Sequence, residues 1–169
     1  MKTFRFTSHL IVVLTFFMFL PVLQAQSKEN ADIPWGAKAS GLQVRIRECP
    51  KSERKEGKAL MIFEVRNTSD QPVDFCWWQS PLERTWTANQ FKITGTQEKI
   101  DYLGMMVKRN PPNKKNGDYT TLNPGWMLSV TFDLKEVYGL RTGSNYSVRY
   151  AGTSLGLPPS NSIDIEFEG

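Results

Sequence analysis

The residue types best suited to catalysis are scarce in this 169-residue sequence, which contains a single histidine, His9. Nucleophilic serine and cysteine enzymes usually need a histidine base, and zinc peptidases of the HExxH type hold their metal with two histidines. His9 lies in a stretch that we expect to be removed on export. A histidine-based triad and a histidine-ligated zinc site are therefore excluded from the mature chain, and we expect no cofactor and no metal.

Carboxylates are the remaining candidates for acid–base chemistry, at Glu83, Asp118, Asp133 and Glu136. A glycosidase needs an acid and a base that face each other across a cleft, and no spacing in the sequence pairs two of these residues. No Asp-x-Asp-x-Asp-Gly loop for calcium occurs either. We predict that the protein is not an enzyme, with carboxylate catalysis as an alternative.

The N-terminus has the layout of a secretory signal peptide. Lys2 and Arg5 precede an apolar run over residues 10–20, and Ala25 supplies a small residue for cleavage. The run is shorter than the roughly 20 residues that cross a bilayer, although an uncleaved anchor is the alternative. We predict a signal peptide over residues 1–25 and a flexible segment over 26–40. The mature chain is expected to be secreted or periplasmic, without a membrane span.

Two cysteines, Cys49 and Cys76, remain after such cleavage. An even number of cysteines in an exported protein favours a disulfide, and we predict a Cys49–Cys76 bridge. Two separate buried thiols are the alternative, because the sequence does not show that the two Cα atoms come within bridging distance.

The rest of the chain alternates apolar and polar residues in short segments between turns, which is typical of an all-β domain. Residues 42–47 and 163–167 alternate most clearly, and could pair so that Arg45 and Arg47 meet Asp164 and Glu166. The other predicted strands are 59–66, 72–78, 90–94, 99–103, 127–133 and 146–151, with one helical turn within 134–140. We predict an immunoglobulin-like antiparallel β-sandwich of about seven to eight strands over residues 41–169.

Several side chains have an expected place in that sandwich. The Tyr146 hydroxyl should bond to upstream backbone, as in a tyrosine corner. Trp77 and Trp78 should point to opposite faces of one strand, so that one of them either lies on the outer face or is covered by the following loop. Residues 51–58 mix lysines with glutamates and are interpreted as the solvated tip of a hairpin rather than as a nucleic-acid patch.

Residues 65–73, 80–83 and 91–93, the run Tyr-Leu-Gly-Met-Met-Val-Lys-Arg over 102–109, and Asp118-Tyr119 together resemble a known family. The sequence over residues 40–152 is similar to the N-terminal pro-domain of secreted peptidyl-Lys metalloendopeptidases, the deuterolysin-like aspzincins. In that family a β-sandwich precedes a zinc domain, assists its folding and restrains its activity. Because the present sequence ends before such a domain, the resemblance implies no catalytic or metal residue here.

We therefore expect an exported, non-catalytic binding domain whose partner is a protein, with an exported peptidase as the first candidate. The alternative is a carbohydrate- or envelope-binding module that uses an exposed tryptophan. The sequence leaves the oligomeric state open. The predicted contact surface comprises Trp78, Pro81, Glu83, Lys108, Arg109, Pro111 and Tyr119.

Overall fold

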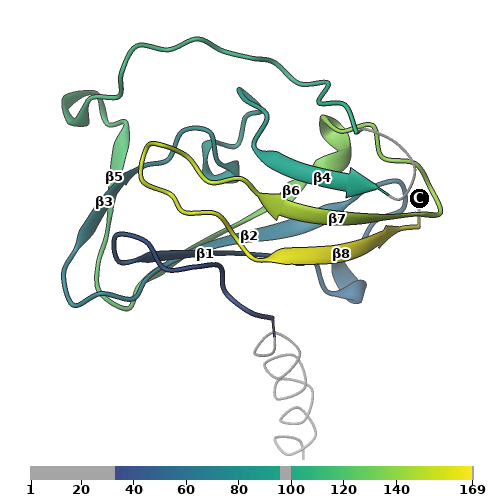
Figure 1. Ribbon diagram of the computed structural model, residues 1–169, viewed down its shortest axis with the longest axis horizontal. Coiled ribbons are helices and arrows are strands. Elements are labelled where there is room, and N and C mark those ends of the chain that lie inside the picture. Colours follow the sequence, from purple (N-terminus) through teal and green to yellow (C-terminus); the bar gives the residue numbers. More distant parts are fainter. Residues whose placement is uncertain (1–32, 96–99, 169) are drawn as a thin grey trace, which may run out of the picture. The chain divides into compact units, whose positions relative to one another are not determined.

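The computed structural model describes residues 33–95 and 100–168 (Figure 1). The described residues from Trp35 onward form one compact unit. The predicted signal peptide and cleavage site lie outside the described residues. Within the described ranges, no helix is long and apolar enough to cross a membrane.

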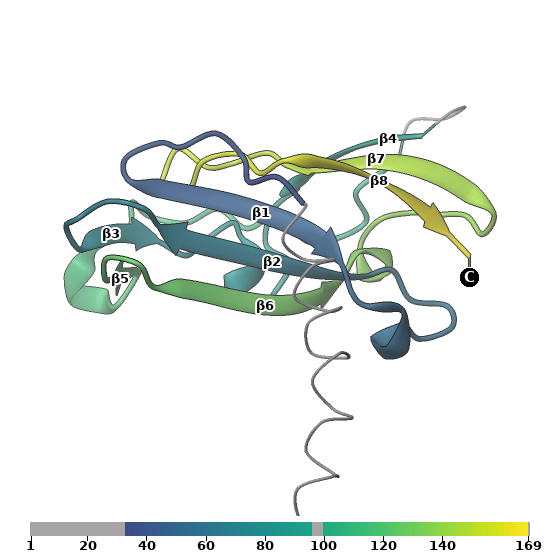
Figure 2. The same ribbon diagram turned by 90° about the horizontal axis from the view of Figure 1, so that it is seen from below.

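The fold is an all-β, sandwich-like arrangement of three antiparallel sheets, as the sequence predicted (Figures 1 and 2). Sheet A has the order β1-β2-β6, sheet B pairs β3 with β5, and sheet C has the order β4-β7-β8. The strands are β1 (Leu42–Glu48), β2 (Leu60–Asn67), β3 (Val73–Cys76), β4 (Phe91–Gly95), β5 (Tyr119–Leu122), β6 (Met127–Asp133), β7 (Ser144–Tyr150) and β8 (Ser162–Phe167).

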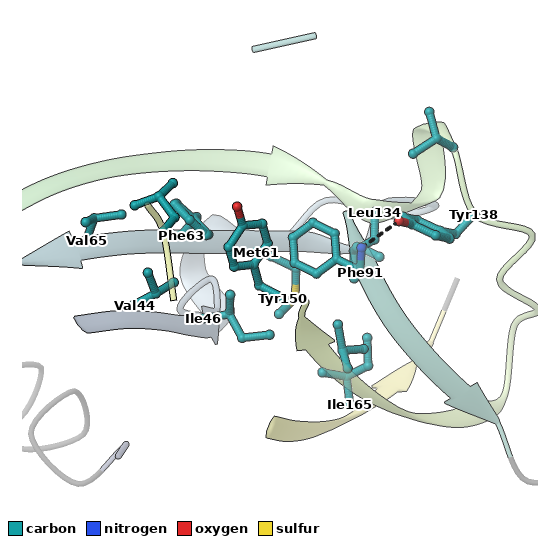
Figure 3. Packing of buried hydrophobic residues seen from close by; sticks show 14 of the residues in the cluster. Val44, Ile46, Met61, Phe63, Val65, Phe91, Leu134, Tyr138, Tyr150 and Ile165 are labelled. Carbon is teal, nitrogen blue, oxygen red and sulfur yellow. Dashed lines mark hydrogen bonds between the residues drawn. The ribbon is translucent and has the colours of Figure 1, made fainter. Parts of the chain in front are cut away.

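The core forms where the apolar sides of sheets A and C meet (Figure 3). Alternate residues of a strand point to one face, so the fully buried Val44 and Ile46 of β1 and Phe63 of β2 share one face of sheet A. Phe63 meets Tyr150 of β7 edge to face, with ring centroids 4.9 Å apart. These contacts join the two sheets without any covalent link.

The opposite face of sheet A is polar, and the arginines of β1 are paired there with a carboxylate. Arg45 Nε donates to Glu64 Oε2 at 2.6 Å, and Arg47 Nη2 lies 3.2 Å from Glu64 Oε1. Glu64 is supplied by β2, which lies next to β1, whereas the predicted neighbour β8 pairs with β7. The predicted pairing of these arginines with the acidic residues of 163–167 is therefore wrong.

Trp35 ties the start of the compact unit to this polar face. The guanidinium carbons of Arg45 and Arg66 lie 4.5 Å and 4.0 Å from the Trp35 ring. Gly36 then donates from its backbone N to the Val44 carbonyl at 2.9 Å. The segment before β1 is thus held by stacking and by main-chain hydrogen bonds from residue 35 onward.

Most predicted strands are present, and the exceptions are informative. β5 was missed, because its Tyr-Thr-Thr-Leu sequence has one buried apolar residue, Leu122, and shows little alternation. The strand predicted over 72–78 ends at Cys76, and that over 99–103 is reduced to an isolated bridge between Tyr102 and Tyr138. The predicted corner is confirmed: Arg141 N donates to the Tyr146 hydroxyl oxygen at 2.7 Å.

Candidate partner-binding surface

A buried carboxylate organises the region where the contact surface was predicted. Glu83 ends the short 3-10 turn η2 (Pro81–Glu83), and its side chain is only 3% exposed. Its Oε2 accepts hydrogen bonds from Gln79 N at 3.0 Å and from the Thr87 hydroxyl at 2.9 Å. Its Oε1 accepts from Arg109 Nη2. Both oxygens therefore have donors, as a desolvated carboxylate requires.

Arg109 connects this carboxylate to the long loop that follows β4. Its guanidinium carbon lies 4.7 Å from the centre of the Trp78 ring. The side chain is 30% exposed, so the interaction is intermediate between a surface and a buried ion pair. We name Trp78, Glu83 and Arg109 the arginine clamp. It fixes the chain at residue 109 against the η2 turn.

The structure thus brings three of the seven predicted contact residues together. Pro81 is the first residue of η2 and is buried, so it contributes to packing within the domain. Lys108 and Pro111 are exposed beside the clamp. Tyr119 lies on β5 opposite Cys76, with the Lys114 ammonium 5.9 Å from its ring centre.

The two adjacent tryptophans lie beyond the end of β3 and do not alternate on a strand. Trp77 packs against the core and donates from Nε1 to the Gly117 carbonyl at 3.2 Å. Trp78 is half-buried beneath Arg109. Both tryptophans of this pair are partly buried, and the described tryptophan with the largest exposed fraction is Trp126, at 62%.

An exposed apolar segment runs into the clamp. Leu103, Met105, Met106 and Val107 expose 70%, 65%, 73% and 42% of their surface. We name residues 103–107 the apolar strap. Large apolar side chains gathered on one surface segment commonly mark an interaction site, and methionine adapts well to a partner's shape.

The strap is fixed at both ends. Leu103 N donates to the Val137 carbonyl at 2.7 Å, and Val107 N donates to the Thr87 carbonyl at 2.9 Å. Within the strap, the Met105 carbonyl accepts a hydrogen bond from the Tyr102 hydroxyl at 2.9 Å. A Cβ at Gly104 would lie 2.4 Å from that hydroxyl oxygen, so a larger residue there would displace the Tyr102 ring. The exposed side chains are therefore presented by an ordered backbone.

Sequence reasoning missed the strap as a surface. The pattern of residues 99–103 predicts a strand, in which alternate apolar residues would point inward. The signal that could have identified it is the unbroken run Met-Met-Val directly before Lys108 and Arg109, since it does not alternate with polar residues.

The predicted disulfide is not formed in the structure. Cys49 and Cys76 are both free and buried. Cys49 follows β1 and donates from its backbone N to the Leu60 carbonyl, whereas Cys76 ends β3 opposite Tyr119. Burial raises the pKa of both thiols. They behave as small core residues at two separate places.

The charged residues of the described part of the chain do not gather into a metal site. Among the described residues, no group of three or more histidine, cysteine, aspartate or glutamate side chains is arranged to hold a metal ion. The Asp74 carboxylate is bound by Lys114 and by the Thr121 hydroxyl, and these two hydrogen bonds lower the pKa of Asp74.

Comparison with known proteins links this chain to a secreted protease. It is 32% identical over 112 residues to an extracellular protease of Aeromonas hydrophila. The match covers 66% of this chain. It covers 30% of that protease, so the chain spans less than a third of the length of its relative. No known family model matches the sequence.

Proposed function

We propose that this chain is a secreted, non-catalytic domain that binds an exported peptidase and, like the pro-domain it resembles, restrains the peptidase or assists its folding. The observation that carries the proposal is the apolar strap, an ordered segment with four exposed large apolar side chains. The similarity to an extracellular protease supports the class of partner.

The apolar strap and the arginine clamp have different roles in this proposal. The strap supplies apolar area, which dominates affinity at most protein interfaces. The arginine clamp holds one end of the strap in place, so less conformational freedom is lost when the partner binds. Lys108, which is exposed beside the clamp, contributes to the polar rim.

Affinity capture with a matched control tests the proposal. The secreted full chain is immobilised and incubated with culture medium of its host, and the captured peptidase is identified by mass spectrometry and by its activity. The double variant Met105→Asp/Met106→Asp should lower the peptidase affinity by more than about tenfold, because two apolar side chains lose their burial.

The control variant Asn145→Asp/Ser154→Asp adds the same charge at two exposed positions away from the strap and should bind as the wild type does. Equal capture by the strap variant and the control would contradict the proposal. Peptidase activity and refolding yield, measured with and without the captured chain, separate restraint from folding assistance.

Trp126 favours a second candidate function, the binding of a carbohydrate or envelope glycan. An exposed indole offers a flat face on which a sugar ring stacks, and Trp126 is the described tryptophan with the largest exposed fraction. Glycan binding that Trp126→Ala abolishes and Met105→Asp/Met106→Asp leaves unchanged would support this function over the first.

A further inference from the structure

The outer edge of β6 is an open edge of sheet A. Asn67 N donates to the Trp126 carbonyl and Leu134 N to the Ala59 carbonyl, which sets the parity of the ladder between β2 and β6. By that parity the backbone groups of residues 128, 130 and 132 face β2, and those of Met127, Ser129 and Thr131 face away from it. Within the described residues, no hydrogen bond satisfies these three outward N–H and C=O pairs.

The other edge of the same sheet is closed. Leu42 exchanges two main-chain hydrogen bonds with Ala39, and Val44 accepts from Gly36. The Asn161 side chain closes the next position, since its Oδ1 accepts from Ile46 N at 2.8 Å and its Nδ2 donates to the Ile46 carbonyl at 3.0 Å. The open edge at β6 is therefore specific to one side of the sheet (Figure 2).

The sequence of β6 does not protect this edge. Edge strands are commonly shielded by lysine, proline or a bulge, which prevent another chain from pairing with them. The strand Met-Leu-Ser-Val-Thr-Phe-Asp contains no lysine, no proline and no glycine, and it pairs with β2 in unbroken register. Its one charged residue, Asp133, is the last residue of the strand, so residues 127–132 present no charge to an added strand.

A groove of about 450 Å³ lies beside this edge. Its walls are formed by Pro81 and residues 84–86 on one side and by residues 129–133 and Glu136 on the other. Trp86 is fixed in the wall, because its Nε1 donates to Glu136 Oε2 at 2.8 Å and its ring meets Phe132 at a centroid distance of 5.9 Å. The groove thus offers an aromatic surface at the level of the free backbone groups.

One cation beside the groove, Arg84, offers a place for an acidic side chain. Asp133 is paired with Lys58 at 3.2 Å, and Glu136 accepts a hydrogen bond from the neutral Trp86 indole. Arg84 is exposed, and within the described residues it has no ion pair. An acidic side chain on the occupant would complement Arg84.

We propose that the open edge of β6 accepts an extended segment of the partner polypeptide as an added strand. The segment's main chain hydrogen bonds to Met127, Ser129 and Thr131, one of its apolar side chains packs on Trp86, and an acidic side chain faces Arg84. That the partner is an exported peptidase rests on the proposed function; the open edge and the groove do not depend on it.

The test uses the full chain and an acetylated, amidated peptide of alternating valine and threonine with one central glutamate. Binding is measured by fluorescence, and amide hydrogen exchange locates the peptide. We expect protection of the Met127, Ser129 and Thr131 amides. N-methylation of the peptide amides that face β6 should weaken binding by about tenfold or more, because donors of the ladder are lost.

Ser129→Pro tests the edge from the protein side. It removes an outward N–H without removing a hydrogen bond to β2, and proline is tolerated on edge strands. We expect about tenfold weaker peptide binding for Ser129→Pro and unchanged binding for the matched control Ser129→Ala, which keeps the N–H. If Ser129→Pro fails to fold, the comparison of the N-methylated with the unmethylated peptide on the wild-type chain still tests the proposal.

Three results would overturn the inference: equal binding of the N-methylated peptide, protection of amides elsewhere than on β6, or a homodimer that Ser129→Pro dissociates, since a second copy would then occupy the edge. Met105→Asp/Met106→Asp should leave peptide binding intact. A wild-type chain that binds the peptide on β6 but captures no peptidase would count against the proposed function alone.

Discussion

The guanidinium carbon of Arg109 lies 4.7 Å from the centre of the Trp78 ring, while the same side chain binds the buried carboxylate of Glu83. Arg109 is far from Trp78 and Glu83 in the sequence, and its contacts with them fix the end of the loop that carries the apolar strap. The surface proposed to bind a partner is consequently built on an ion pair of the folded domain. This relationship gives Arg109 and its exposed neighbour Lys108 different roles.

Arg109→Ala should lower the free energy of unfolding by about 1–3 kcal/mol, because it removes the cation from a Glu83 carboxylate that stays buried. The range is reduced for the partial exposure of Arg109. Urea unfolding measures the change. Lys108→Ala, the adjacent control, should stay within about 0.5 kcal/mol of the wild type. Equal destabilisation by both variants would contradict the role assigned to the clamp.

Stability should decline at alkaline pH through Tyr138. Burial raises the pKa of Tyr138 from 10.0 to about 12, and its hydroxyl accepts from Phe91 N at 3.0 Å (Figure 3). The raised pKa means that the folded state holds the proton more tightly. The resulting contribution to the free energy of unfolding is complete below pH 10 and is lost as the pH rises towards 12.

The loss amounts to about 2–3 kcal/mol. Urea unfolding between pH 9 and pH 12 measures it, and Tyr138→Phe should have a correspondingly shallower alkaline decline. If the two profiles fall in parallel, Tyr138 does not carry the effect.

Both cysteines should remain reduced in the purified protein. A thiol reagent should label neither Cys49 nor Cys76 in the native state at pH 7, because both are buried and burial raises the pKa of each thiol. Both should react after denaturation. A mass two hydrogens lower under non-reducing conditions would show a bridge and contradict the structure.

Asn161→Ala should destabilise the domain by about 1–3 kcal/mol, because it leaves Ile46 N and O without partners at the closed edge of sheet A. Hydrogen exchange of the Ile46 amide should accelerate as well. Asn145→Ala, at an exposed position on β7, is the control and should change the free energy of unfolding by less than about 0.5 kcal/mol. An unchanged Ile46 exchange rate would show that the Asn161 amide does not close the edge.

The all-β class, most strand positions and the Tyr146 corner could be predicted from the sequence. These features follow from local patterns. Alternation along a strand indicates which of its residues share a face, and this does not depend on which strand lies next to it. The β6 bounds at residues 127–133 and the buried Val44 and Ile46 were predictable for that reason.

Which segments lie next to each other could not be predicted in this way. Glu64 takes both arginines of β1 because β2, and not β8, is the adjacent strand. The candidate site also depends on contacts between distant segments. The clamp joins Glu83 to Arg109, and the strap is exposed because its ends are hydrogen-bonded to Thr87 and Val137. The position of β6 in sheet A leaves its outer edge free. Each of these depends on long-range packing, which a pattern of neighbouring residues does not encode.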